Sequence, residues 1–254
     1  MSKRVKVILL ILIAAVIFVS ASFAEPIEIP KITIGLDEAT EPQDAVNTIQ
    51  IILLLTILSL APSILVLMTS FTRIIIVLSF LRSALGTNQM PPNQVLIGLA
   101  LFLTFFIMSP TLATINEQAL QPYLANEITQ QEAYDNAIEP IKNFMLGQLR
   151  GESDLALFVE LAEMTEVPED LSKLPLTVII PAFIISELKI AFQMGFVIYI
   201  PFLIIDMIVS STLMSMGMMM LPPSLISMPF KLLLFILVDG WNLVVTTVVT
   251  GFKR

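Results

Sequence analysis

The sequence contains no cysteine and no histidine among its 254 residues. Without cysteine the chain cannot form disulfide bonds or use thiolate chemistry. Without histidine it cannot use imidazole acid–base catalysis or bind a metal through histidine ligands. These absences exclude most common enzyme mechanisms, and we expect no catalytic residue, no metal site and no cofactor.

Charge is also scarce in this chain. Charged residues make up 13% of it, 56% of the residues are hydrophobic, and the mean hydropathy is +0.91. A soluble domain of this length is less apolar. The fold class we expect is an all-α membrane protein of helical hairpins. Charges and prolines interrupt its apolar segments, which indicates one subunit of a larger membrane assembly.

The N-terminus has the pattern of a secretory signal peptide over residues 1–24. Three basic residues precede an uncharged apolar run over residues 7–19, and small residues follow before Glu25. This pattern predicts cleavage between Ala24 and Glu25. An uncleaved membrane anchor is the alternative, but the short apolar core favours cleavage.

Charge and proline content divide the rest of the chain into four regions. Residues 25–48 are acidic and proline-rich without periodicity, which predicts an extended extracytoplasmic leader. Residues 49–110 contain two apolar stretches and predict a first membrane hairpin. Residues 111–175 carry twelve acidic residues against three basic ones and predict a small helical extracytoplasmic domain. Residues 176–254 predict a second membrane region of two helical hairpins. Its potential breaks are Gly195, Pro201, Gly217, Pro222 and Pro223.

The acidic region has a recognisable helix start. Thr129 and Glu132 have the spacing of a capping box, and Pro140 is expected to kink or restart the helix that follows. A domain of this size has little core of its own. Without disulfides it needs support from the membrane region or from sister subunits.

The distribution of basic residues leaves the topology open. With an exported N-terminus, Arg73 and Arg82 fall on the cytoplasmic side and the acidic region falls outside. Four spans then place the C-terminus outside as well, whereas Lys253 and Arg254 favour the inside. The number of lipid-facing spans is therefore smaller than hydropathy suggests if some apolar helices are buried in the assembly.

Seven charged residues lie within the apolar stretches, where each costs about 2.5–3.5 kcal/mol at the centre of a bilayer. They are Arg73, Arg82, Glu187, Lys189, Asp206, Lys231 and Asp239. Four are positive and three are negative, so we expect them to pair between helices or subunits and to serve assembly. Alternatively, the long side chains of Arg73, Arg82 and Lys231 reach the lipid headgroups from the membrane interface.

Five of the fourteen methionines cluster in the middle of the second membrane region, at positions 214, 216, 218, 219 and 220. Gly217, Pro222 and Pro223 are expected to stop the helix and form a loop at membrane depth. Such backbone is tolerated where protein or a water-filled cavity covers it. Flexible methionine side chains from several copies could close a pore and yet yield to a passing chain. The alternative is that they fill irregular gaps between helices.

Two long segments of the sequence resemble one known family. They are FTRIIIVLSFLRSALGTNQMPPNQVLIGLALFLTFFIMSP over residues 71–110 and PAFIISELKIAFQMGFVIYIPFLIIDMIVSSTLMSMGMMMLPPSLISMPFKLLLFILVDGW over residues 181–241. Both closely resemble the FliP family, the P subunits of the flagellar type III export gate and their injectisome counterparts. The leader and the acidic region match less tightly, so their details stay open.

The resemblance implies a core subunit of the flagellar type III protein export gate in the inner membrane, at the flagellar basal body. Sister P subunits with FliQ and FliR would form a channel for unfolded flagellar proteins, with further export apparatus proteins as partners and no nucleic acid. Met218, Met219 and Met220, grouped with Met216, would be the methionine loop that seals the channel. Transport energy would come from the proton motive force and a separate ATPase, which agrees with the absence of a Gly-x-x-x-x-Gly-Lys loop.

Two other functions are compatible with the residues. Asp206 and Asp239 could form the carboxylate pair of an intramembrane aspartyl protease, although neither stands in a Gly-x-Gly-Asp pattern. A small-ion transporter could use the intramembrane Asp and Lys residues as a relay. A seal made by the methionine segment separates the export gate from the transporter, and Asp206→Asn with Asp239→Asn tests the protease.

Overall fold

The computed structural model describes residues 42–254 except residues 88, 165–167, 169, 219–220 and 253–254. Within these residues every regular element is a helix, which confirms the all-α prediction. The elements are α2 (Pro42–Met68), α3 (Phe71–Ala84), α4 (Asn93–Ile115), the π-helix η1 (Asn116–Leu120), α5 (Gln121–Leu124), α6 (Gln130–Gln148), α7 (Glu152–Leu161), the 3-10 helix η2 (Leu171–Lys173), α8 (Leu176–Ser215), α9 (Pro223–Leu237) and α10 (Gly240–Thr250). The predicted signal peptide and its predicted cleavage site, Ala24 and Glu25, lie outside the described residues.

The chain divides into two units, residues 1–56 and residues 57–254. The described part of the first unit is the beginning of α2, where the Thr56 hydroxyl donates to the carbonyl of Ile52 at 2.8 Å. Helix α2 begins at Pro42, so residues 42–48 are helical and the predicted extended leader is wrong there. All further elements belong to the second unit.

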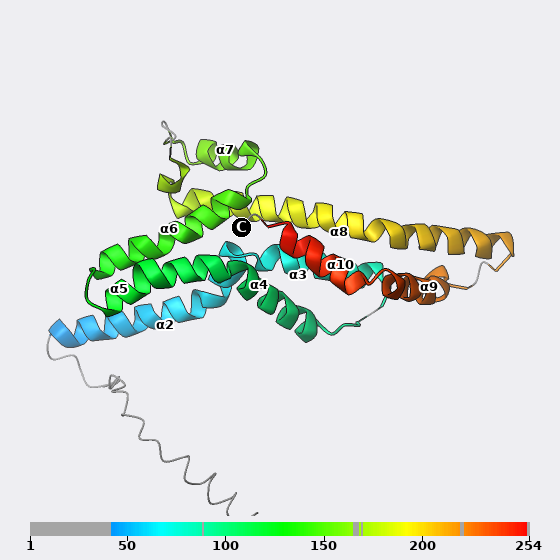
Figure 1. Ribbon diagram of the computed structural model, residues 1–254, viewed down its shortest axis with the longest axis horizontal. Helices are drawn as coiled ribbons and strands as arrows, with labels where there is room; N and C mark the ends of the chain where they lie inside the picture. The colour runs from blue at the N-terminus through cyan, green and yellow to red at the C-terminus, as the bar shows by residue number, and fades with distance from the viewer. Residues whose placement is uncertain (1–41, 88, 165–167, 169, 219–220, 253–254) are drawn as a thin grey trace, which may run out of the picture. The chain divides into compact units, whose positions relative to one another are not determined.

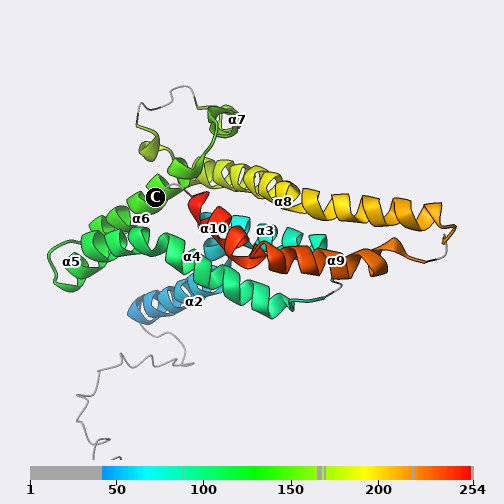
Figure 2. The same ribbon diagram turned by 45° about the vertical axis from the view of Figure 1, so that its right-hand side comes forward.

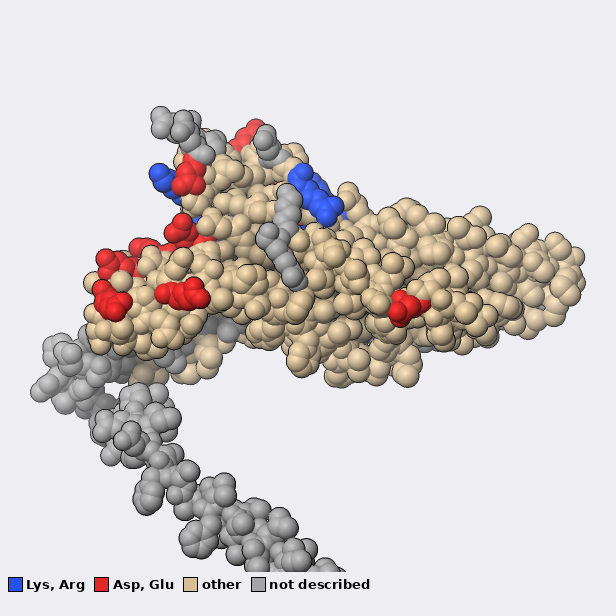
Figure 3. All heavy atoms as spheres, in the orientation of Figure 1, with Lys and Arg blue, Asp and Glu red and all other residues tan. Residues whose placement is uncertain are grey.

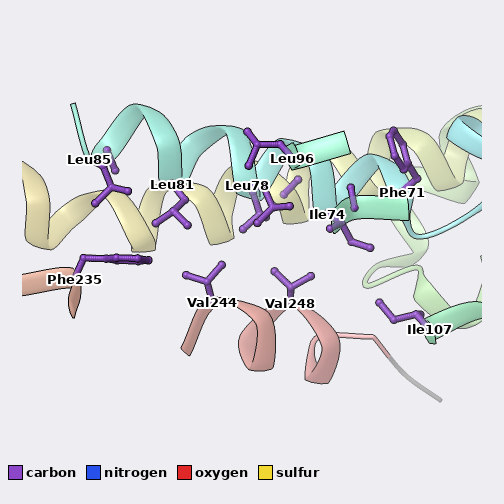
Figure 4. Packing of buried hydrophobic residues seen from close by; sticks show 14 of the residues in the cluster. Phe71, Ile74, Leu78, Leu81, Leu85, Leu96, Ile107, Phe235, Val244 and Val248 are labelled. Carbon is purple, nitrogen blue, oxygen red and sulfur yellow. The ribbon is translucent and has the colours of Figure 1, made fainter. Parts of the chain in front are cut away.

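The core of the second unit lies around α3. Its buried apolar residues, which recur every three or four positions, are Phe71, Ile74, Val77, Leu78, Leu81 and Ala84. This spacing places one apolar stripe along a helix. Leu96 of α4, Phe235 of α9, and Val244 and Val248 of α10 pack against the stripe (Figure 4). Each fully buried side chain of this size contributes roughly 1.5–3 kcal/mol, so α3 holds the membrane helices together.

Helix α8 runs without a break for 40 residues, or about 60 Å at 1.5 Å per residue. It packs against α3 and α7 in its first half and against α9 near its end (Figures 1 and 2). Pro181 and Pro201 lie inside this helix. Proline is tolerated within membrane helices because neighbouring groups satisfy the freed carbonyl. The expected breaks at Gly195 and Pro201 are therefore wrong.

The second membrane region consequently contains one long helix and a bent arm, and the prediction of two helical hairpins is wrong. The arm is α9 followed by α10, which meet at 66°. The α9–α10 bend and the connection from α8 to α9 are the breaks that the described part of this region contains. Gly195 instead marks a close approach, because a Cβ built there would lie 2.5 Å from Cγ of Phe80 on α3.

The acidic region is helical, but helix α4 crosses its expected boundary. The chain stays helical from Asn93 through Pro110 and the π-helix to Leu124, a stretch of 32 residues. The predicted capping box is confirmed, since the Thr129 hydroxyl accepts from the Glu132 backbone N–H and the Glu132 carboxylate accepts from the Thr129 N–H. Helix α6 continues through Pro140 and does not restart there.

Helices α6 and α7 have no separate core and pack on the first half of α8. Their shared cluster of buried residues contains Met145, Leu155, Val159, Leu174, Val178, Ile179, Ala182 and Phe183. The Lys142 ammonium donates to the carbonyls of Ser172 and Leu174 at 2.9 and 2.8 Å and so ties α6 to η2. The acidic region therefore depends on the membrane region for support, as its size predicts.

Two helical stretches are long and apolar enough to cross a membrane, namely Asn93–Leu124 and Leu176–Ser215. Two bent pairs pass the same test if each counts as one span. These are Pro62–Met68 with Phe71–Ala84, at 81°, and Pro223–Leu237 with Gly240–Thr250. The described residues thus provide two to four spans. Figure 3 shows charge gathered over α5, α6 and α7 and an almost entirely uncharged face over the outer parts of α8 and α9.

Candidate functional site

The centre of the membrane region contains a fully buried ion pair between α3 and α8. Nε of Arg73 donates to Oε2 of Glu187 at 2.8 Å, and Nη2 of Arg73 bonds Oε1 of the same carboxylate. Both side chains are 0% exposed. A guanidinium matches a carboxylate in this two-pronged arrangement, which orients the two helices as well as neutralising both charges. Interfacial placement of Arg73 is therefore wrong.

The C-terminal segment completes this cluster. The third nitrogen, Nη1 of Arg73, donates to the carbonyl of Gly251 at 2.9 Å, and the guanidinium lies 3.7 Å above the ring of Phe252. Arg150, between α6 and α7, donates to the same carbonyl at 3.4 Å. A cation over an aromatic face is attracted by the ring electrons. One arginine therefore joins α3, α8 and the end of α10.

A second ion pair joins the distal half of α8 to α9. Nζ of Lys231 donates to Oδ2 of Asp206 at 2.6 Å, and the hydroxyl of Ser227 donates to Oδ1 at 2.6 Å. Lys231 and Ser227 are buried, whereas the Asp206 side chain is 33% exposed. Burial of the ammonium is possible because the carboxylate neutralises it. For Lys231, too, placement among lipid headgroups is wrong.

The third pair lies at the surface and connects α8 to α7. Lys189 bonds Asp154, and the lysine side chain is mostly exposed. The Asp154 side chain is only 9% exposed, so the pair is half-buried, with its ammonium end screened by solvent. Glu187 and Lys189 thus point to different partners, as their separation of two residues on a helix predicts.

Arg82 and Asp239 differ from the other five predicted charges. Nη1 of Arg82 bonds the side-chain oxygen of Asn93 and lies 3.4 Å from the carbonyl of Pro91. Oδ2 of Asp239 accepts from the Asn242 amide at 3.2 Å. Neither forms an ion pair with another described residue. A contact of any of the seven charges with another subunit stays a prediction.

The methionine segment begins where α8 ends. Gly217 has a φ of +72°, its N–H donates to Met214, and the N–H of Met218 donates to Leu213 at 3.0 Å. These two hydrogen bonds around a glycine in the left-handed conformation form a Schellman motif, which ends a helix. Pro222 then caps α9 and Pro223 is its first residue, a position that suits proline. Gly217, Pro222 and Pro223 therefore bound the turn between α8 and α9.

The methionines of this turn are exposed where the structure describes them. Met216 is 68% exposed and Met218 is 41% exposed, so neither fills a gap between helices of this chain. Met219 and Met220 lie outside the described residues. That Met216, Met218, Met219 and Met220 together close a channel stays a prediction.

Several partners in these clusters were not identified from the sequence, among them Asp154, Ser227, Gly251 and Phe252. Asp154 belonged to the acidic region, and nothing local connects it with Lys189, 35 positions away. Ser227 lies one helical turn before Lys231, which is the one signal that could have placed it beside the same carboxylate. The Gly251 contact uses a backbone carbonyl, which carries no sequence signal.

The arrangement does not join the two aspartates proposed for a protease. The Asp206 carboxylate bonds Lys231 and Ser227, whereas that of Asp239 bonds Asn242. The described residues also contain no group of three or more acidic side chains that could hold a metal ion. These clusters join helices of the chain to one another.

Comparison with known proteins identifies the family. The FliP family model matches residues 54–248. The chain is 59% identical over 219 residues to the flagellar biosynthetic protein FliP of Bacillus subtilis (strain 168), which covers 86% of this chain and 98% of the relative. It is 48% identical over 242 residues to that of Aquifex aeolicus (strain VF5), covering 94% and 98%. With the match extending over most of its length, the chain belongs to the FliP family.

Proposed function

We propose that the chain is a core subunit of the flagellar type III protein export gate in the inner membrane, at the flagellar basal body. Several copies assemble with FliQ and FliR and with further export apparatus proteins, and together they enclose the channel through which unfolded flagellar proteins pass. The observation that carries the proposal is the family match over residues 54–248. The relatives are named flagellar biosynthetic proteins.

The exposed apolar surface supports assembly with other subunits. Along the outer half of α8, Phe196, Met207 and Ile208 are each more than 60% exposed, and α9 adds Leu225 and Ile236. Exposed apolar patches of this extent mark contact with lipid or protein. The paired charges beneath them are already satisfied within the chain, so the helices can enter such an environment without an uncompensated charge at those positions.

The methionine loop serves as the seal of the resting channel. Two observations support this role. The Schellman motif at Gly217 and the prolines after it end both helices and leave the segment between them outside either helix. Met216 and Met218 are also exposed. Unbranched thioether side chains adapt their shape, so a ring of them closes around solutes and parts for a polypeptide. The subunit is a conduit, since the sequence has no phosphate-binding Gly-x-x-x-x-Gly-Lys loop.

A solute leak separates the seal from a packing role. We expect alanine at positions 218, 219 and 220 to make the resting gate leak ions and small solutes in membrane vesicles while the complex with FliQ and FliR still forms. Met214→Ala is the matched control, because Met214 is also an exposed methionine, at 61%, but lies in the last turn of α8. A complex that assembles fully and leaks no more than the wild type would rule out the seal.

A further inference from the structure

The bend between α9 and α10 carries the carboxylate of Asp239, which has no basic side chain beside it among the described residues. Glu187 and Asp206 each pair with a basic side chain, whereas Asp239 does not pair with any described residue. Asp239 is exposed, and its side-chain hydrogen bond among the described residues is to a neutral group, the amide of Asn242 at 3.2 Å. Among the acidic residues of α8 to α10, it alone retains an uncompensated charge within the part that the structure describes.

The backbone at this bend does not explain why the residue is charged. Asp239 has a φ of 49° and a ψ of 54°, a left-handed conformation that glycine and asparagine also adopt readily. As the residue before α10, it could cap the first backbone N–H groups, yet its side chain makes no such hydrogen bond. The positive end of the helix favours a nearby carboxylate, but solvent-exposed interactions of this kind are weak.

The surroundings of Asp239 are apolar and open. Ile236 and Leu237 precede it and are each 74% exposed, and Leu243 follows at 59%. An apolar surface of this kind becomes covered when subunits associate. Covering it removes water from the Asp239 carboxylate, and a carboxylate that loses water without gaining a cation is strongly disfavoured. A covering surface that brings a basic side chain avoids this cost.

Arg82 is the complementary feature on the same chain. It is partly exposed, and its hydrogen bonds go to neutral oxygens of Asn93 and Pro91, with no carboxylate among the described residues. It lies on α3 between Leu81 and Leu85, and Figure 4 shows these leucines at the level of Phe235 and Val244. Those two residues flank the α9–α10 bend. Leu81 and Leu85 belong to the same buried cluster as Phe235 and Val244, so the end of α3 that carries Arg82 packs beside the bend that carries Asp239.

We infer that Asp239 of one copy pairs with Arg82 of the next copy in the assembly, an inference that rests on the proposed gate of several copies. The two residues carry opposite charges that no described side chain of opposite sign neutralises, and a second copy related to the first by rotation can bring them together. Because the two residues come from different patches, the contact is heterologous and repeats from copy to copy. The apolar residues around Asp239 are buried by the same contact.

The absence of cysteine allows a direct test. Arg82→Cys and Asp239→Cys are introduced together, the protein is expressed with FliQ and FliR, and the membranes are treated with a short bifunctional maleimide, because the Cα atoms of an Arg–Asp pair can lie farther apart than a disulfide spans. A heterologous contact gives a ladder of cross-linked dimers, trimers and larger species, whereas each single variant gives none. The matched control combines Asp239→Cys with Leu161→Cys, which is exposed on α7 and lies in the acidic region.

Charge exchange supplies a second measurement. Arg82→Asp and Asp239→Arg each lower the yield of purified complex by about tenfold, and the two changes together restore it. Asn93→Ala is the control for lost contacts within the chain, because it removes the Arg82 hydrogen bond and leaves both charges in place. It leaves the yield of complex unchanged.

Three outcomes overturn the inference. A complex that forms normally but gives no ladder excludes the Arg82–Asp239 contact and leaves the proposed gate intact. Dimers from Asp239→Cys alone indicate a two-fold contact, and a cross-linked product that contains FliQ or FliR identifies a different neighbour. If the wild-type chain forms no complex with FliQ and FliR, it is the proposed function that fails.

Discussion

Arg73 and Glu187 lie 114 positions apart in the sequence and form a two-pronged ion pair from which water is excluded on both sides. The pair holds α3 against α8, and the remaining guanidinium nitrogen holds the C-terminal segment through Gly251. Removal of one partner leaves the other charge buried and alone, which typically costs about 3–5 kcal/mol. The stability of the membrane core therefore depends on the two residues together.

We expect Glu187→Leu to lower the free energy of unfolding by about 3–5 kcal/mol, because Arg73 keeps its charge in a site without water. Arg73→Met combined with Glu187→Leu regains much of that loss, since neither charge is then buried. Thermal unfolding of the detergent-purified complex measures both. A double variant no more stable than Glu187→Leu alone would show that the hydrogen bond to Gly251 and the Phe252 contact matter more than the pair.

The contact between Gly195 and Phe80 gives a packing prediction. A Cβ at position 195 would lie 2.5 Å from the Phe80 ring, so Gly195→Ala forces α3 and α8 apart and destabilises the protein by about 1–3 kcal/mol. Gly98→Ala on α4 is the matched control, because nothing lies within 4 Å of its Cβ position. That variant gains helix propensity and is expected to be neutral or slightly stabilising. Unfolding temperatures that fall equally in both variants would contradict the clash.

The Asp206 cluster makes a more local prediction. Ser227→Ala removes a hydrogen bond to a carboxylate and is expected to destabilise the contact between α8 and α9 by about 1.5–3 kcal/mol. The control is Ser215→Ala, whose hydroxyl is exposed and bonds the Ser211 carbonyl of its own helix. Hydrogen exchange of the α9 amides measures the difference. Equal exchange in the two variants would mean that Lys231 alone holds Asp206.

The capping box makes the start of α6 sensitive to pH. The hydrogen bonds from the Thr129 backbone and side chain lower the pKa of Glu132 below its ordinary value of 4.5. A group whose pKa is lower in the folded state stabilises it above that ordinary value, and the contribution is lost as pH falls through the folded pKa. We therefore expect amide protection in the first turn of α6 to decrease when the pH is brought below 4.5.

Glu132→Gln is the control for this pH effect. Glutamine keeps an oxygen that accepts from the Thr129 N–H but does not titrate, so the first turn of α6 should lose its acid sensitivity in this variant. Protection factors for residues 130–133, measured by hydrogen exchange across the acid range, compare the two proteins. Identical acid profiles would assign the loss of protection to another group.

Short-range features of this protein were predictable from the sequence. The capping box of Thr129 and Glu132 spans one helical turn, and the apolar composition determines the helical membrane class in the same direct way. Family membership also followed from contiguous residues, those of the segments 71–110 and 181–241. The residues of the capping box are close together in the chain, and each segment that resembles the family is contiguous.

Only the tertiary structure decided which charged residues pair and which glycines and prolines interrupt a helix. Arg73 pairs with Glu187 and Lys189 with Asp154 because folding brings distant helices together, and a sequence alone does not specify which partner a charge will meet. Gly195 and Pro201 were expected to interrupt α8, yet packing against neighbouring helices offsets their weak helix propensity. The sequence by itself determined that this is a helical membrane protein of the FliP family with interrupting charges, and tertiary packing decided which of those charges are satisfied within the chain.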